Sequence, residues 1–315
     1  MFLVCGEALF DFFPVSAPET EASGALRFEA RLGGSPFNVA LGLARLGCRS
    51  ALLTGLSTDF LGARLRAALE AEGVATDHLI AKERPTTLSL VGLDSRGQPS
   101  YAFYGRDAAD RALTEADLPA LGPEVAAIHV GSYSLVVEPT GTSLLRLVRR
   151  ESARRLISLD PNVRLTVVSD VALWRRRVAD FAAAAHVIKL SSEDFESLYG
   201  DAAPESVVRG WLDAGACLVV LTRGAEGADA YTQNATATTA GVAVEVADSV
   251  GAGDGFQAAL LCALDELGLA TPSALTEVGE AALVRVLDFA VRASAIACAR
   301  RGADLARRAD LPALA

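Results

Sequence analysis

The chain has 315 residues, enough for one large α/β domain or two ordinary ones. Hydrophobic residues make up 51% and charged residues 22%, so a sizeable core can form and a disordered chain is excluded. The net charge of −10 argues against a nucleic-acid surface. No apolar run is long enough to cross a bilayer, and the N-terminus reaches Glu7 too soon for a signal peptide.

The five cysteines lie far apart in apolar surroundings and show no metal-ligand spacing. Buried free thiols in a reducing compartment account for them, so we expect a cytoplasmic protein that does not bind membranes. His129 and His186 lie within apolar runs. We expect both to be strand residues with hydrogen-bonded ring nitrogens rather than metal ligands.

Short apolar runs alternate with amphipathic helical patterns along almost the whole chain. In chain order, the predicted strands are 2–8, 50–55, 126–131, 155–159, 186–190 and 217–222. The predicted helices are 36–47, 60–73, 141–153, 171–184, 192–199, 204–214, 254–267 and 276–300. This alternation indicates a mostly parallel sheet with helices on both faces. We expect a single α/β domain over residues 1–315, because no Pro/Gly/Ser-rich linker separates its halves.

Two segments interrupt the α/β pattern. Residues 24–32 and 86–104 contain alternating or β-branched runs, and the second segment includes the turn sequence Asp94-Ser95-Arg96-Gly97. Such a turn between two strand-like runs predicts a hairpin. A small β-layer formed by about residues 12–32 and 86–106 could cover a ligand as a lid, extend a sheet edge, or form a dimer contact.

Polar or small residues follow each predicted strand. In sheets of this kind, ligands bind beyond the carboxyl ends of the strands, so the recurrence indicates one shared site. The residues are Asp11, Gly55–Asp59, Gly131–Ser132, Asp160–Arg164, Lys189 with Ser191 and Glu193–Asp194, and Thr222–Gly224.

The most informative segment is Asp248-Ser-Val-Gly-Ala-Gly-Asp-Gly-Phe256. The small residues Gly251, Ala252 and Gly253 precede Asp254 and a helical apolar pattern. A small-residue loop that opens a helix presents unpaired N–H groups at the positive end of the helix dipole, which suits a phosphate. A carboxylate at that point is typical of phosphoryl transfer to a hydroxyl, whereas the plainer reading is a glycine-rich turn with an Asp that favours the dipole. The spacing fits neither a Walker A loop nor a dinucleotide-binding loop.

The segment from Gly33 to Gly47 predicts a clean helix entry and exit. Ser35 is the expected N-cap, Pro36 occupies the first turn, and Gly47 follows the last apolar turn. The absent side chains of the glycine pair at 33–34 permit close approach of a ligand. The amide of Asn38, in the first turn, can both donate and accept hydrogen bonds, as a polyhydroxy ligand requires.

Together these two segments resemble the two signature regions of the PfkB/ribokinase-like carbohydrate kinases, and the resemblance covers nearly the whole chain. Gly6-Glu-Ala-Leu-Phe-Asp11 is similar to the family's first, sugar-binding strand. The resemblance implies a three-layer α/β/α fold with a mostly parallel central sheet and a small β-sheet lid. Within the family, Asp160-Pro-Asn-Val-Arg164 and the stretch from Tyr101 to Leu113 resemble those of fructokinases, although Gly105 is an extra residue before Arg106.

The resemblance implies a role for each matching residue. Asp254 would accept the proton of the sugar hydroxyl, while the amides of residues 251–253 form the anion hole and Arg164 offsets phosphate charge. The sugar would be bound by Asp11, Gly33, Gly34, Asn38 and Asn162, with Phe103 or Arg106 closing over it. ATP would contact Lys189, Ser191, Thr222, Gly224, Gly227, Gly251 and Gly253. Water around Mg²⁺ would be organised by Asp194 or Glu193, and a monovalent cation such as K⁺ would lie near Asp248 and Val250.

The expected activity is therefore transfer of the γ-phosphoryl group of ATP to a primary hydroxyl of a hexose, with D-fructose giving fructose 6-phosphate. A 2-keto-3-deoxygluconate kinase or a ribokinase of the same family is the alternative. A non-catalytic sugar-sensing module is a third reading, which the retention of Asp254 and of the small-residue loop disfavours. The resemblance also implies a homodimer formed through the lid.

Overall fold

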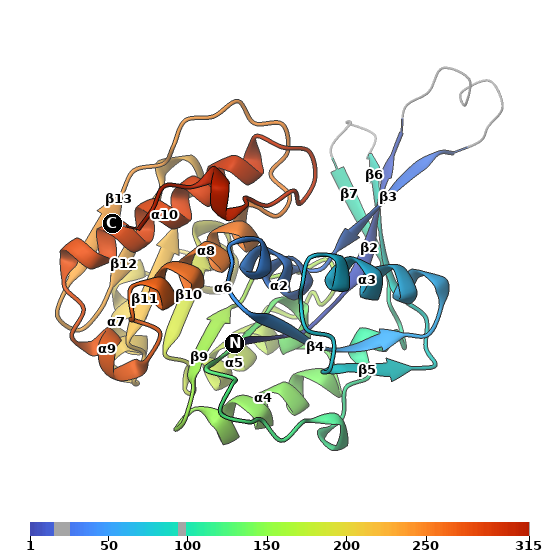
Figure 1. The fold of residues 1–315 in the computed structure, drawn as a ribbon, viewed down its shortest axis with the longest axis horizontal. Coiled ribbons are helices and arrows are strands. Elements are labelled where there is room, and N and C mark those ends of the chain that lie inside the picture. Colours follow the sequence, from blue (N-terminus) through green and yellow to red (C-terminus); the bar gives the residue numbers. More distant parts are fainter. Residues whose placement is uncertain (16–25, 94–98, 315) are drawn as a thin grey trace.

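The computed structural model describes residues 1–15, 26–93 and 99–314. Its centre is a nine-stranded sheet in the order β13-β12-β11-β10-β9-β8-β1-β4-β5 (Figure 1). Neighbouring strands are parallel from β11 to β5, and only β12 and β13 are antiparallel. The strands are β1 Phe2–Cys5, β4 Ser50–Ser57, β5 Leu79–Lys82, β8 Ala127–Gly131, β9 Leu156–Asp160, β10 Val187–Ser191, β11 Leu218–Thr222, β12 Ala228–Tyr231 and β13 Thr236–Thr239.

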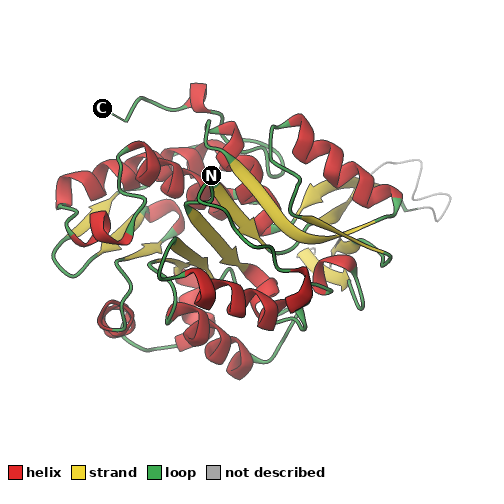
Figure 2. Cartoon of the chain, turned by 60° about the horizontal axis from the view of Figure 1, so that its bottom comes forward, coloured by secondary structure: helices red, strands yellow, loops and turns green. Residues whose placement is uncertain are grey.

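Helices cover both faces of this sheet, because successive strand residues point to opposite sides and both sides are apolar (Figure 2). Val4 faces one helix layer and its neighbour Leu3 faces the other. The first layer contains α2 Ser35–Arg45, α3 Phe60–Ala71, α8 Ala252–Glu266, α9 Pro272–Thr276 and α10 Glu280–Cys298. The second contains α4 Thr140–Glu151, α5 Val171–Ala182, α6 Ser192–Tyr199 and α7 Pro204–Asp213. The predicted three-layer arrangement is confirmed.

A separate four-stranded sheet, here called the small sheet, has the order β3-β2-β6-β7 and extends away from the main sheet (Figure 1). Its strands are β2 Leu9–Pro14, β3 Phe28–Gly33, β6 Thr87–Leu93 and β7 Pro99–Tyr104. The antiparallel pairing of β6 with β7 confirms the predicted hairpin, whose turn at Asp94–Gly97 lies outside the described residues. Gly34 alone separates β3 from α2, so the small sheet leads directly into a helix that packs on the main sheet.

All six predicted strands and all eight helical segments have counterparts, with three differences. The sequence analysis missed β5, β12 and β13. The helix predicted at 276–300 starts later, because α9 ends at Thr276 and α10 begins at Glu280. The prediction that Ser35 caps α2 is wrong: Gly34 occupies the cap position and no side chain caps the helix. None of the helices in the described ranges combines the length and apolar character that a bilayer span requires.

Candidate active site

The start of α8 has the geometry of an anion site. Gly251 adopts a left-handed conformation (φ 81°) at the cap position, where a Cβ would lie 2.8 Å from the Cβ of Ala303. The amide of Ala252 donates to the carbonyl of Ser249 (3.3 Å). No partner for the amides of Gly253 and Asp254 occurs in the described part of the chain. These two N–H groups and the helix dipole therefore favour a negatively charged ligand here.

Asp254 is buried at this helix start, and α2 holds both of its carboxylate oxygens. Ser35 donates from Oγ to Oδ1 (2.6 Å), and Asn38 donates from Nδ2 to Oδ2 (2.8 Å). Burial raises the pKa of Asp254, while the two hydrogen bonds and the positive charge of Arg164 lower it. The result is one acid in a fixed orientation beside unpaired amides, which can accept a proton from a hydroxyl held next to it.

Asp11 reaches the same region from β2. A Cβ on Gly33 would clash with Oδ2 of Asp11, so the glycine makes room for this carboxylate. Gly34 has φ 105°, and a Cβ there would lie 2.7 Å from the carbonyl oxygen of Glu7. Burial raises the pKa of Asp11. The positive charge of Arg164 lowers this pKa, and the negative charge of Asp254 raises it. Two predicted sugar-binding groups, Asp11 and Asn38, therefore lie beside the predicted base.

A buried ion pair lies under the anion site. Lys189 Nζ is 2.9 Å from Asp160 Oδ2, and the two side chains are 4% and 1% exposed. Nζ is also 3.3 Å from the place that a Cβ on Gly253 would occupy. Burial lowers the pKa of Lys189, but Asp160, Asp194 and Asp254 together more than compensate and the net shift is upward, so the ammonium stays charged. Lys189 is a predicted nucleotide ligand, and its pairing with Asp160 is not among the predictions.

A second buried polar group is formed by side chains of β8, β9 and α8. Ser158 Oγ is 3.1 Å from His129 Nδ1 and 2.9 Å from Gln257 Nε2, but His129 Nε2 has no partner among the described residues. The expectation that both ring nitrogens of His129 are satisfied is therefore wrong. Burial lowers the pKa of His129 to about 4, so its ring is neutral. His186, predicted in a strand, lies just before β10, and its Nδ1 accepts from the amide of Ile157 (3.0 Å).

The loop after β9 meets the start of α6. The amide of Val163 donates to Oδ1 of buried Asp194 (2.9 Å), and Asn162 before it has a positive φ of 39°. Burial raises the pKa of Asp194, and the charge of Asp160 adds to the effect. Ser191 accepts from the amide of Asp194 (3.0 Å) and is the N-cap of α6.

These residues fit a hard divalent cation only in part. Oδ1 of Asp160 has no partner among the described residues, and burial together with the charge of Asp160 raises the pKa of Asp194, so a cation near these two carboxylates would be favoured. However, within the described ranges no group of three His, Cys, Asp or Glu side chains could hold a metal ion. Phosphate and water oxygens would have to complete the shell of Mg²⁺. Of the two acids predicted for this role, Asp194 is buried and Glu193 is exposed.

Asp248 organises the loop before α8. Its Oδ1 accepts from the amide of Val250 (3.0 Å) and its Oδ2 from the amide of Gly302 (2.9 Å). A Cβ on Gly302 would clash with the guanidinium of Arg31, so this β3 side chain packs directly on the segment after α10 that contains Gly302. The carboxylate thus fixes two backbone segments next to the anion site.

The predicted nucleotide residues on β11 and its loop are close in space. Thr222 ends β11, and Gly224 and Gly227 follow with positive φ angles of 52° and 104°. A Cβ on Gly227 would clash with the carbonyl oxygen of Thr239, so packing against β13 already requires this glycine. Nothing lies within 4 Å of the corresponding point on Gly224, which leaves its backbone open to a ligand.

The predicted lid residues differ in their surroundings. Phe103 packs edge-to-face on Tyr133, with ring centroids 6.4 Å apart, whereas Arg106 is exposed and forms no ion pair among the described residues. The extra residue, Gly105, makes room for Arg111, since its Cβ would lie 2.8 Å from Nη2 of that residue. Among the described residues, no hydrogen bond or ion pair links Arg106 to another predicted site residue.

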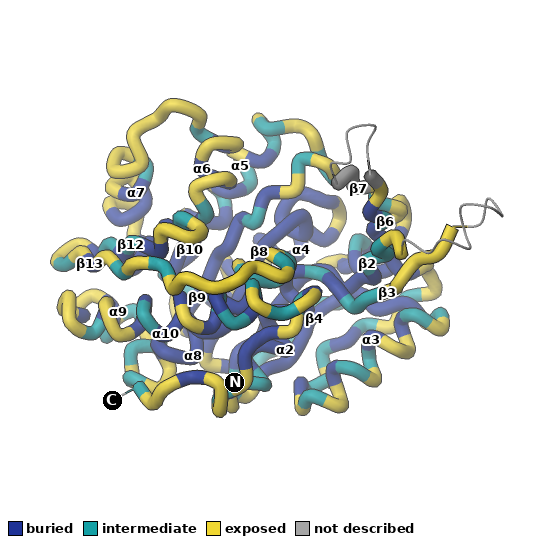
Figure 3. The backbone as a smooth tube through the Cα atoms, turned by 90° about the horizontal axis from the view of Figure 1, so that it is seen from above, coloured by how far each residue is buried: buried dark blue, intermediate teal, exposed yellow. Residues whose placement is uncertain are grey.

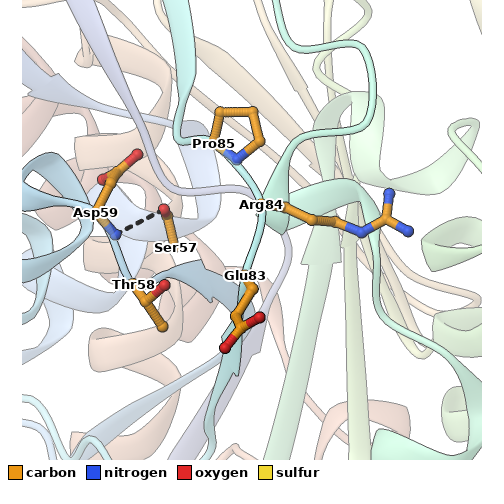
Figure 4. A pocket seen from close by; sticks show the side chains of 6 residues that line it. All are labelled: Ser57, Thr58, Asp59, Glu83, Arg84 and Pro85. Carbon is orange, nitrogen blue, oxygen red and sulfur yellow. Dashed lines mark hydrogen bonds between the residues drawn. The ribbon is translucent and has the colours of Figure 1, made fainter.

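The polar residues after β4 have a structural explanation. Asp59 caps α3 by accepting from the amide of Gly62 (2.7 Å), and it also bonds the amide (2.9 Å) and hydroxyl (2.7 Å) of Thr86. An open hollow of about 530 Å³ beside them is lined by Ser57, Thr58, Asp59, Glu83, Arg84 and Pro85 (Figure 4). None of these residues belongs to the predicted substrate or nucleotide sets.

Comparison with known proteins finds relatives that match almost the whole chain. Residues 1–309 match the family described as pfkB family carbohydrate kinase. A fructokinase of Rhizobium leguminosarum bv. trifolii is 39% identical over 285 residues, which cover 90% of this chain and 85% of that protein.

Solved structures are similar over almost the whole chain. The fructokinase of Xylella fastidiosa with bound ATP has a TM-score of 0.85 at 27% identity, covering 99% of this chain and 95% of that one. A double-mutant fructokinase of Vibrio cholerae O395, with fructose, ADP and potassium ion bound, has a TM-score of 0.82 at 28% identity and covers 96% and 93%. The nucleotide, the sugar and the potassium ion belong to those proteins' crystals.

Proposed function

The chain belongs to the pfkB family of carbohydrate kinases, and we propose that it transfers the γ-phosphoryl group of ATP to a primary hydroxyl of D-fructose. The observation that carries this proposal is Asp254: a buried carboxylate, oriented by two hydrogen bonds, beside unpaired amides at a helix start. The fructokinases among its relatives support fructose as the acceptor.

Asp254 is the proposed base. Phosphoryl transfer passes through a loose transition state, so the protein mainly positions groups and stabilises charge. A carboxylate is a weak base toward an alcohol, but it needs to take the proton only late, as the oxygen bonds to phosphorus. General-base help of this kind is worth roughly 10²- to 10⁴-fold in rate.

The amides at the start of α8 are the proposed anion hole for the transferring group. Lys189 lies directly below them and adds a fixed positive charge, and Arg164 adds a second one from the loop after β9. Thr222, Gly224, Gly227 and Ser191 are the proposed nucleotide contacts around this point. Fixed donors cost no reorganisation at the moment of reaction, which makes them effective in a partly dry site.

Two cations complete the proposal. Mg²⁺ would bind the phosphates of ATP and be oriented through water by Asp194 and Asp160; when bound, it supplies charge neutralisation. A monovalent cation would lie near Asp248 and Val250, and the potassium ion in a similar fructokinase supports this assignment. Asp248 already holds that loop in shape through its two backbone hydrogen bonds.

The proposed sugar site lies between the main domain and the small sheet. Asp11, Asn38 and Asn162 would bind sugar hydroxyls, and the glycine pair at 33–34 would let the sugar approach the backbone. Phe103 and Arg106 would close over the sugar, with the small sheet acting as a lid on a single domain of residues 1–315. We also propose a homodimer through the lid and a cytoplasmic location. Light scattering tests the first, and the free thiols of all five cysteines agree with the second.

The test is ADP release with ATP and Mg²⁺ on a panel of D-fructose, D-ribose and 2-keto-3-deoxygluconate, each with and without KCl. We expect kcat/KM to be highest for D-fructose and KCl to raise it. A higher value for either other sugar would replace the acceptor but keep the reaction. Binding of a sugar by calorimetry without turnover on any of the three would instead identify a sensing module.

A further inference from the structure

Ser35 stands out because its side chain does not perform the task expected at a helix start. It is the first residue of α2, it is only 7% exposed, and Gly34 already occupies the cap position. Its Oγ donates instead to Oδ1 of Asp254 at 2.6 Å, across 219 positions of sequence. A hydroxyl that was needed only for capping would accept from a backbone amide two or three residues further on.

We propose that Ser35 is a positioning residue for phosphoryl transfer, which sets the orientation of the Asp254 carboxylate; this rests on the proposed function. Its partner is Asn38, which holds the other carboxylate oxygen from the same first turn of α2. The torsion that turns an Asp carboxylate is broad, so a single donor would leave its plane free to rotate. Two donors three residues apart on one helix fix that plane.

The consequence is geometric. With both oxygens engaged from the side of α2, the remaining lone pair on each oxygen is the one offered to the sugar hydroxyl. A misplacement of about 1 Å in a base can cost on the order of 100-fold in rate. Removing the Ser35 hydroxyl would therefore lower kcat while leaving the residues that bind sugar and ATP in place.

Loss of the Ser35 hydrogen bond would change the pKa of Asp254 in a definite direction. Charged side chains of four other elements face Asp254: Asp11 from β2, Asp160 from β9, Arg164 from the loop after β9 and Lys189 from β10. Burial raises the pKa of Asp254 and the Ser35 hydrogen bond lowers it. Loss of that bond therefore raises the pKa. Because the base must be ionised, the acidic limb of the kcat profile would move to higher pH.

The test compares Ser35→Ala with Ser35→Thr and with Ser50→Ala. Ser50 is the matched control: its buried hydroxyl also bonds α2, through the carbonyl of Ala40 (2.8 Å), but does not touch Asp254. A hydrogen bond to a charged group corresponds to a change of about 10- to 100-fold. We expect Ser35→Ala to lose kcat in that range with small changes in both KM values, and its acidic limb to move to higher pH. Ser35→Thr should restore both.

Three outcomes would overturn the proposal: unchanged kcat and pH profile in Ser35→Ala, an equal loss in Ser50→Ala, or a loss in Ser35→Ala that comes entirely from KM. Melting temperatures of all variants separate misfolding from a kinetic effect. Failure of the proposed function looks different, because then the wild-type protein turns over none of the sugars. A last check is the double variant Ser35→Ala/Asp254→Asn, which should be no slower than Asp254→Asn alone, since Ser35 acts only through Asp254.

Discussion

The floor of the site and the small sheet above it are built in opposite ways. The floor, defined here as Ser35, Asn38, Asp160, Lys189 and Asp254, is buried, and its members bond one another. The small sheet is exposed along Phe28–Ala30 of β3 (Figure 3). Groups on the floor therefore hold their positions before any ligand arrives, whereas groups on the small sheet have bonding capacity left for a ligand. We expect floor variants to affect turnover or stability, and small-sheet variants to affect affinity.

Asp254→Asn should have the largest effect. The amide cannot accept the proton, so we expect kcat to fall by about 10²- to 10⁴-fold. The dissociation constant for sugar, measured by calorimetry, should change little, because the replacement has nearly the same shape. Turnover close to that of the wild type would remove Asp254 from the mechanism and with it the role of the floor.

Lys189→Met tests the stability of the floor. It leaves Asp160 buried without its partner, which should cost about 3–5 kcal/mol of unfolding free energy. Lys82→Met is the control, because Lys82 and Asp117 form a pair of similar length (2.7 Å) that is more exposed, at 19% and 18%. That loss should be about 1 kcal/mol or less. Equal losses in denaturant titrations would contradict the contrast between the two pairs.

Asp11→Ala tests whether a residue of the small sheet determines affinity for the sugar. We expect the KM for sugar to rise by about 10- to 100-fold, as for loss of a hydrogen bond to a charged group. The KM for ATP should stay within a few-fold, and Asp11→Asn should lie between the two. An equal loss of affinity for sugar and for ATP would contradict the assignment of Asp11 to the sugar site.

Phe103→Ala should have the smallest effect. Loss of the edge-to-face contact with Tyr133 corresponds to about 0.5–1.5 kcal/mol beyond the buried area. We expect the KM for sugar to rise a few-fold with kcat nearly unchanged. Tyr104→Ala is the control, since the neighbouring side chain is 62% exposed and points to the other face of β7. A fall in kcat as large as that of Asp254→Asn would break the division between the two regions.

The sequence predicted most strands of the main sheet because these strands are continuous apolar runs, and it predicted the helix α8 because an apolar helical pattern follows the small residues at 251–253. It missed β5, β12 and β13, which have only four residues each and little apolar periodicity. It also misassigned Ser35, since local spacing makes a serine before Pro36 look like a cap. The true partner, Asp254, is 219 positions away, and no local pattern reports such a distance. The Lys189–Asp160 pair was missed for the same reason.

The two hydrogen bonds to Asp254 also restrict how a hydroxyl can reach it. Oδ1 is engaged by Ser35 and Oδ2 by Asn38, both from the first turn of α2. Each oxygen keeps a lone pair, so a water molecule or a sugar hydroxyl can still donate to the carboxylate from the side that α2 leaves open. Discrimination between these two acceptors would therefore fall to the residues that orient the sugar, and not to Asp254.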